Sequence, residues 1–134
     1  MDEKTKRSAS LTFRGFLKSP EEVESLVGVK AALLAQSGQP KKPNRPNVWP
    51  RSVAMFQVEF EDNAQIVDMI PAILAHVGGL DRVRAVLEQI SPEFLEVNLV
   101  LPIRYSEAQE DGYVEVQTLR DLAELGATLG LSFV

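Results

Sequence analysis

The chain contains no cysteine and only one histidine among its 134 residues. Without cysteine it can form no disulfide, no thiolate metal site and no cysteine nucleophile. The single histidine excludes the histidine-pair zinc motifs, and no phosphate-binding glycine loop or dinucleotide fingerprint is present. We therefore expect no catalytic residue, no metal and no cofactor, and we favour a protein that is not an enzyme.

Long apolar runs are also missing. No stretch reaches the roughly 18 consecutive apolar residues of a membrane span, and the first residues, MDEKTKRSAS, lack the apolar run of a secretory signal. We therefore expect a soluble, cytoplasmic protein with no membrane contact. Residues 1–7 are charged and predicted to form a flexible tail, which leaves 8–134 as a single domain with enough apolar residues for a core.

Acidic residues are absent between Glu24 and Glu59. Residues 1–51 hold ten basic and five acidic side chains, and the remaining 83 residues hold four and fourteen, so the two parts carry charges of +5 and −10. The net charge of −5 argues against general binding to nucleic acid. The basic excess instead favours a local anionic partner.

Alternating apolar residues predict strands, and apolar residues at a period of 3.6 predict helices. Lys30–Gln36, KAALLAQ, contains a possible helical turn before a loop. Ser19 can cap a helix that begins at Pro20, and Asn63 can cap another in which Pro71 should cause a kink or a late start. The predicted strands cover residues 8–16, 53–60, 94–105 and 129–133, and the predicted helices cover residues 20–27, 64–77, 80–90 and 116–125.

This order of elements predicts an α+β fold, a two-layer sandwich in which helices pack on one face of a sheet of about four strands. Alternation, rather than solid apolar runs, favours a mixed or antiparallel sheet. We expect a ferredoxin-like variant in which the central helix pair replaces the usual hairpin. The end of the long alternating strand 94–105, near Pro102, is predicted to lie at a sheet edge or bulge. An exposed edge of this kind either pairs with a second copy, which we expect to give a homodimer, or must be covered.

Several structural motifs also suggest a family. These are the first strand with SPEEVESLVGV, then Gly38, then Trp49 leading into a strand, then LAHVGGL, and finally LRDLAELGATLGLSFV. This spacing, over nearly the whole chain, resembles the bacterial family named domain of unknown function 4279. Pro50 after Trp49 and the absence of a serine-proline start to the last helix depart from its pattern. The family is uncharacterised, so the resemblance implies no catalytic residue.

The candidate binding segment is the loop 38–51, which contains PNRPNVWP. Trp49 has the largest apolar area in the chain and is predicted to be largely buried against the first helix or the sheet, in a structural clasp. The basic side chains of this loop can either lie against the acidic half of the molecule or project into solvent, and we favour projection. The candidate binding residues are Lys41, Lys42, Arg45, Trp49 and Arg51.

Other titratable groups are interpreted as structural. His76 falls near a predicted helix end, where a cation is favourable. Two clusters of carboxylates could hold a hard cation or transfer protons, but neither has the spacing of a calcium loop. The first cluster is Glu59, Glu61 and Asp62, and the second is Glu107, Glu110 and Asp111. We interpret them as a helix N-terminus and a solvated loop.

Two classes of function remain. The first is a non-catalytic protein-interaction module of the immunity or regulatory type, with an unidentified protein partner. The alternative is a small-molecule-binding or enzymatic domain that uses a cleft beside the basic loop 38–51.

Overall fold

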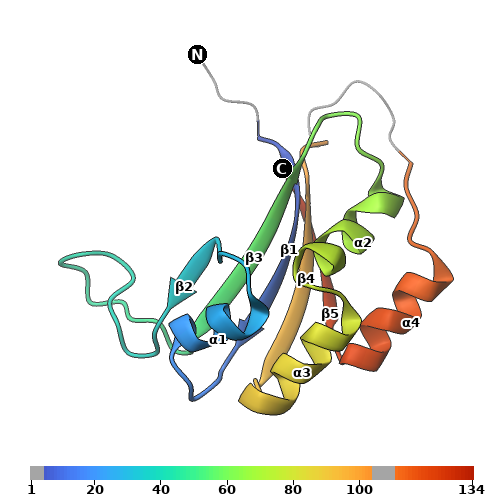
Figure 1. Ribbon diagram of the computed structural model, residues 1–134. Helices are drawn as coiled ribbons and strands as arrows, with labels where there is room; N and C mark the ends of the chain where they lie inside the picture. The colour runs from blue at the N-terminus through green and yellow to red at the C-terminus, as the bar shows by residue number, and fades with distance from the viewer. Residues whose placement is uncertain (1–4, 104–110) are drawn as a thin grey trace.

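A computed structural model describes residues 5–103 and 111–134 of the chain. Figure 1 shows the arrangement of their elements. The described residues form five strands and four helices, in the order β1 (Arg7–Arg14), α1 (Pro20–Val27), β2 (Leu33–Ala35), β3 (Val53–Phe60), α2 (Ile66–His76), α3 (Leu80–Ile90), β4 (Phe94–Leu101), α4 (Val116–Leu125) and β5 (Thr128–Phe133).

The described strands make one mixed sheet with the order β2-β3-β1-β4-β5. The central strand β1 runs antiparallel to both β3 and β4, whereas β5 runs parallel to β4. Parallel neighbours need a crossover connection, and here the connection from β4 to β5 contains α4. The helix pair α2–α3 connects β3 to β4, as the sequence predicts.

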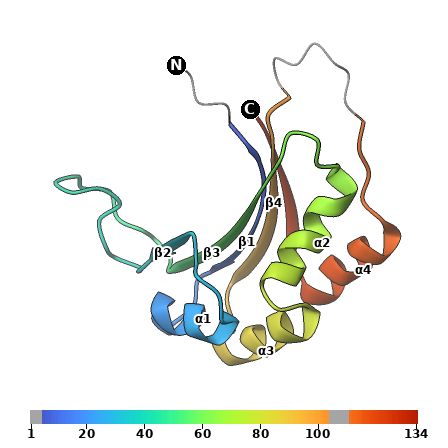
Figure 2. The same cartoon turned by 45° about the horizontal axis from the view of Figure 1, so that its top comes forward.

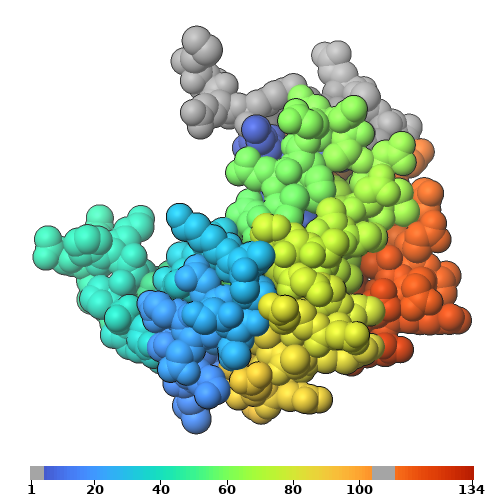
Figure 3. Space-filling model, in the orientation of Figure 1, coloured from blue at the N-terminus to red at the C-terminus, as the bar shows by residue number. Residues whose placement is uncertain are grey.

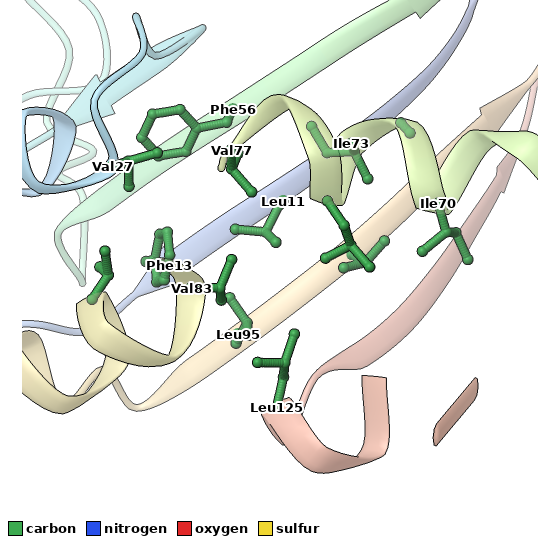
Figure 4. Packing of buried hydrophobic residues seen from close by; sticks show 14 of the residues in the cluster. Leu11, Phe13, Val27, Phe56, Ile70, Ile73, Val77, Val83, Leu95 and Leu125 are labelled. Atoms are coloured by element: carbon green, nitrogen blue, oxygen red, sulfur yellow. The ribbon is translucent and has the colours of Figure 1, made fainter. Parts of the chain in front are cut away.

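All four helices of the described chain lie on one face of the sheet (Figure 2). The register places Leu11 of β1 between Phe56 of β3 and Val97 of β4, and all three are fully buried. Phe13 packs edge-on against Phe56, with ring centroids 6.2 Å apart. Figure 4 shows helix residues such as Ile73 and Val83 over these strands. The predicted α+β sandwich is confirmed, with five strands instead of four.

The other face of the sheet is mainly polar. Ser8, Ser10 and Thr12 of the central strand point to this face, because they alternate with the core residues of β1. Longer side chains on the two neighbouring strands, including Glu96 and Met55 opposite Thr12, leave Thr12 only 2% exposed. This face explains why the strands alternate in sequence.

Several boundaries differ from the sequence prediction. Arg7, assigned to the tail, is the first residue of β1, and β4 ends at Leu101 instead of continuing to Tyr105. The segment KAALLAQ contains strand β2 and no helical turn, because Leu33–Ala35 pair with the end of β3. Residues 1–4 of the predicted tail, residues 104–105 of the predicted strand and most of the loop SEAQEDG lie outside the described residues.

The predicted edge position of the strand 94–105 is wrong. β4 lies inside the sheet, paired with β1 on one side and with β5 on the other. The strand that lies at this edge is β5. Self-association through β4 is therefore not available.

The helix ends follow local chemistry. Ser19 accepts a hydrogen bond from the Glu22 backbone N–H at 3.2 Å, and Gly28 ends α1 in the left-handed conformation, as predicted. The second helix begins after Gln65 instead of Asn63, and Pro71 lies inside it. Within residues 5–103 and 111–134, no helix has the length and hydropathy required to cross a bilayer.

Candidate functional site

The loop between β2 and β3 forms a projecting arm. Residues 38–51, which we call the basic arm, extend away from the helices and the sheet in Figure 1 and form a separate lobe in the space-filling view of Figure 3. Every residue from 38 to 48 is exposed. The basic arm has no acidic residue and four basic ones.

Backbone hydrogen bonds give the basic arm a hairpin-like shape. The Gly38 N–H donates to the Trp49 carbonyl at 2.8 Å, and the Trp49 N–H donates to the Gln39 carbonyl at 2.9 Å. Further out, Lys41 N–H donates to the carbonyl of Asn47 at 3.0 Å. The sequence lacks strand-like alternation here, yet these hydrogen bonds hold the two sides of the loop next to each other.

A tight turn closes the tip. The Arg45 N–H donates to the Lys42 carbonyl at 3.3 Å, and Asn44 has a φ of +61°. Proline at the second turn position and asparagine with positive φ at the third are typical of a type II turn. Pro43 and Asn44 therefore fix the direction in which the neighbouring cations point.

The base of the basic arm is attached to the sheet through Ser52. This side chain is 1% exposed, and its hydroxyl oxygen accepts hydrogen bonds from the Ser37 N–H at 3.0 Å and the Gln36 amide at 3.1 Å. Arg51 reinforces the junction, because its Nε donates to Glu93 Oε2 at 2.7 Å and its guanidinium carbon lies 5.1 Å from the centre of the Phe94 ring. The arm thus projects from a fixed base.

The structure brings together three of the five predicted site residues. Lys41, Lys42 and Arg45 line an open hollow of about 280 Å³, and Asn47 completes the lining. Among the described residues, no carboxylate forms an ion pair with any of these three cations. The exposure of Lys41, Lys42 and Arg45 agrees with their predicted projection, whereas Arg51 lies against Glu93 of the acidic half. Sequence reasoning missed Asn47, although the repeated Pro-Asn pairs of PNRPN could have indicated it.

Arg51 and Trp49 have other roles. Arg51 faces Glu93 at the base and does not line the hollow. Trp49 is partly buried, but it is neither in the hydrophobic core nor among the residues packed against it, so the predicted clasp against the first helix or the sheet is wrong. Instead, Lys41 Nζ lies 5.2 Å from the centre of its ring. An exposed cation–π contact of this kind contributes about 0.5–1 kcal/mol and orients Lys41.

The titratable candidates outside the arm do not form a metal site among the residues that the structure describes. His76 is the exposed last residue of α2, and Glu59 pairs with Lys6 at 3.9 Å on the surface. Within the described part of the chain, no three histidine, aspartate or glutamate side chains gather as a metal site would require. Glu107 and Glu110 lie outside the described residues.

A second cleft, of about 550 Å³, lies at the other end of β1. Its lining includes Arg7 and Tyr113, together with two of the candidate carboxylates, Asp62 and Asp111. It is not beside the basic arm, because the arm joins the opposite end of β1, where the Gly15 N–H donates to the Ser52 carbonyl at 3.0 Å.

Comparison with protein-family models, with curated proteins and with solved structures finds no match to this chain. The resemblance to domain of unknown function 4279 therefore stays a prediction, and the function must be argued from the arm itself.

Proposed function

We propose that this chain is a small non-catalytic bacterial protein, of the regulatory or immunity type, that acts in the cytoplasm by binding an acidic segment of a partner protein. The observation that carries the proposal is the hollow in which Lys41, Lys42 and Arg45 converge on the exposed tip of the basic arm without an acidic partner among the described residues. Three unpaired cations close together give a local positive potential, which attracts carboxylates and accelerates their encounter.

The shape of the hollow supports a protein partner over a small molecule. Sites for small ligands are usually concave, mainly apolar and about 300–1,000 Å³ in volume. The hollow at the tip of the arm is open and slightly smaller than this range, and charged or amide side chains alone line it. A partner that presents several carboxylates along an extended surface matches such a tip better than an enclosed metabolite.

The remainder of the molecule limits which anions can approach. Residues 52–134 carry a charge of −10, which repels long polyanions such as nucleic acid and anionic membranes. A short acidic segment can reach the projecting tip without lying against that remainder. The proposal therefore predicts that the tip of the arm binds short acidic segments in preference to long polyanions.

The test is a variant in which Lys41, Lys42 and Arg45 are changed to serine. Its matched control changes Lys6, Lys18 and Lys30 to serine, which alters the net charge equally but leaves the arm intact. Trp49 is the only tryptophan and lies against Lys41, so its fluorescence should report binding of a synthetic peptide rich in aspartate and glutamate. We expect the arm variant to lose at least about tenfold in affinity and the control to bind like the parent.

Two outcomes contradict the proposal. Equal losses in both variants would show that only overall charge matters. A response of Trp49 to inorganic phosphate, without any response to the acidic peptide, would favour the small-molecule alternative. Thermal melting of each variant shows whether a lost signal reflects binding or unfolding.

A further inference from the structure

The outer strand β5 has a free backbone edge. Within the described sheet it pairs only with β4, so the N–H and C=O groups on its other side have no strand partner. Such an edge is a template for another strand, and proteins usually protect it with charged residues, proline, a bulge or a very short strand.

β5 carries none of the chemical protections. The segment ATLGLSFV, residues 127–134, contains no charged residue and no proline. The opposite edge of the sheet differs, because β2 has only three residues and the exposed part of β3 beyond it carries Glu59. The unprotected edge is therefore specific to one side of the molecule.

Apolar side chains extend to this same edge. The register places Leu131 beside Leu99 and Phe133 beside Leu101, on the face that the helices cover. Leu99 and Leu101 are buried, whereas Leu131 and Phe133 are 52% and 53% exposed. The apolar row of the core thus continues onto β5 and ends uncovered.

The neighbouring helix adds to the uncovered surface. Glu124 of α4 faces α3, because its carboxylate pairs with Arg84 at 2.5 Å. Successive residues of a helix are about 100° apart, so Leu119 points roughly 140° away from Glu124, toward the side of α4 opposite α3. Leu119 is 48% exposed, and Figures 1 and 2 show α4 as the outermost helix on the β5 side. We call Leu131 and Phe133 the edge strip.

We propose that the edge strip binds a second copy of this chain. In the complex, β5 pairs antiparallel with the same strand of the partner across a two-fold axis, and the two sheets join into one. A two-fold axis brings the same surface of both copies together and requires the paired edge strands to be antiparallel.

The absence of charge in residues 127–134 favours this occupant, because two copies of β5 can pair without placing like charges opposite each other. Leu129 and Phe133 are equally spaced about Leu131, so an axis at Leu131 places Leu129 opposite the partner's Phe133. Opposed residues of an antiparallel pair lie on the same face, so this register buries the apolar row of both copies at once.

The test measures the mass of the purified chain in solution. We expect a species of about twice 14.8 kDa at tens of micromolar by light scattering and sedimentation. Leu131→Glu should raise the dimer dissociation constant at least about tenfold, because a carboxylate would be buried at the seam, and Phe133→Glu should also weaken the dimer. The matched control is Leu17→Glu, since Leu17 is fully exposed and lies in the loop between β1 and α1, neither of which pairs with β5.

The proposal is overturned by a monomer mass for the parent chain, by a dimer that persists in Leu131→Glu, or by equal dissociation of Leu17→Glu. Hydrogen exchange of the parent chain gives a test that does not depend on variants folding. The β5 amides should become better protected as protein concentration rises, and exchange that is independent of concentration would contradict the proposed pairing.

Discussion

Gly15 holds the junction where the central strand, the basic arm and β4 meet. Its N–H donates to the Ser52 carbonyl at 3.0 Å, and its carbonyl accepts from the Glu93 N–H at 3.1 Å. Its φ is +78°, a left-handed conformation that glycine adopts without steric cost. The side chain of Glu93 packs directly against Gly15 and pairs with Arg51. Gly15 therefore positions the Arg51–Glu93 ion pair at the base of the arm.

Substitution of Gly15 by alanine should destabilise the protein more than the same change at Gly38. Both residues have positive φ, and alanine there costs roughly 1–2 kcal/mol. At Gly15 the new Cβ would also lie 2.9 Å from the Glu93 Cβ, whereas at Gly38 it would meet no atom within 4 Å. We expect a loss of about 2–3 kcal/mol for Gly15→Ala and about 1 kcal/mol for Gly38→Ala, measured by urea unfolding. Equal losses would mean that backbone conformation alone matters at Gly15.

Among the elements, the basic arm stands apart from the core. Its base is fixed by the buried Ser52, but no residue from 37 to 48 is buried. The two sides of the arm already meet at its base, where the Trp49 N–H donates a hydrogen bond to the Gln39 carbonyl. The arm beyond this point therefore contributes little to the stability of the sheet.

Replacement of residues 40–48 by Asn-Gly should leave stability almost unchanged. Asn-Gly closes a two-residue hairpin, so Gln39 and Trp49 can remain adjacent. Since no apolar core contact is removed, we expect the free energy of unfolding to change by no more than about 1 kcal/mol, while binding of the acidic peptide is lost. A loss of several kcal/mol in urea unfolding would instead show that the arm closes the core.

The elements also show which parts of the fold the sequence could predict. Alternation in residues such as Leu11 and Phe56 predicts the long strands, because each of them has one buried face. The strand β2 was missed because alanine and leucine favour helices, and pairing with β3 outweighs that local preference.

The strand order and the arrangement of side chains on the basic arm depend on long-range contacts, which the local sequence does not show. Nothing in residues 94–101 shows that β5 covers their outer edge, so the predicted edge was assigned to the wrong strand. The cationic character of the site followed directly from the lysines and arginines of the loop. The loop sequence could not predict that Arg51 is separate from Lys41, Lys42 and Arg45. This separation depends on Glu93, which lies 42 residues from Arg51 along the chain.

At the scale of the whole molecule, the two proposed surfaces lie at opposite sides of the sheet. The basic arm follows β2 at one edge, and β5 forms the other edge. Joining two copies through β5 would therefore place the two arms at the outer ends of the joined sheet. With strands about 4.8 Å apart, the arms would be on the order of 45 Å from each other.

This separation predicts that dimerisation and partner binding are independent. One short acidic segment cannot reach both arms, so the dimer should bind one peptide per chain without any gain from bivalency. Leu131→Glu, measured where it is monomeric, should therefore bind the acidic peptide with the affinity and stoichiometry of the parent in calorimetry. The triple serine variant of the arm should in turn keep the dimer mass in light scattering. If Leu131→Glu folds but loses the peptide, the arm and β5 belong to one composite site, and the separation of the two surfaces is wrong.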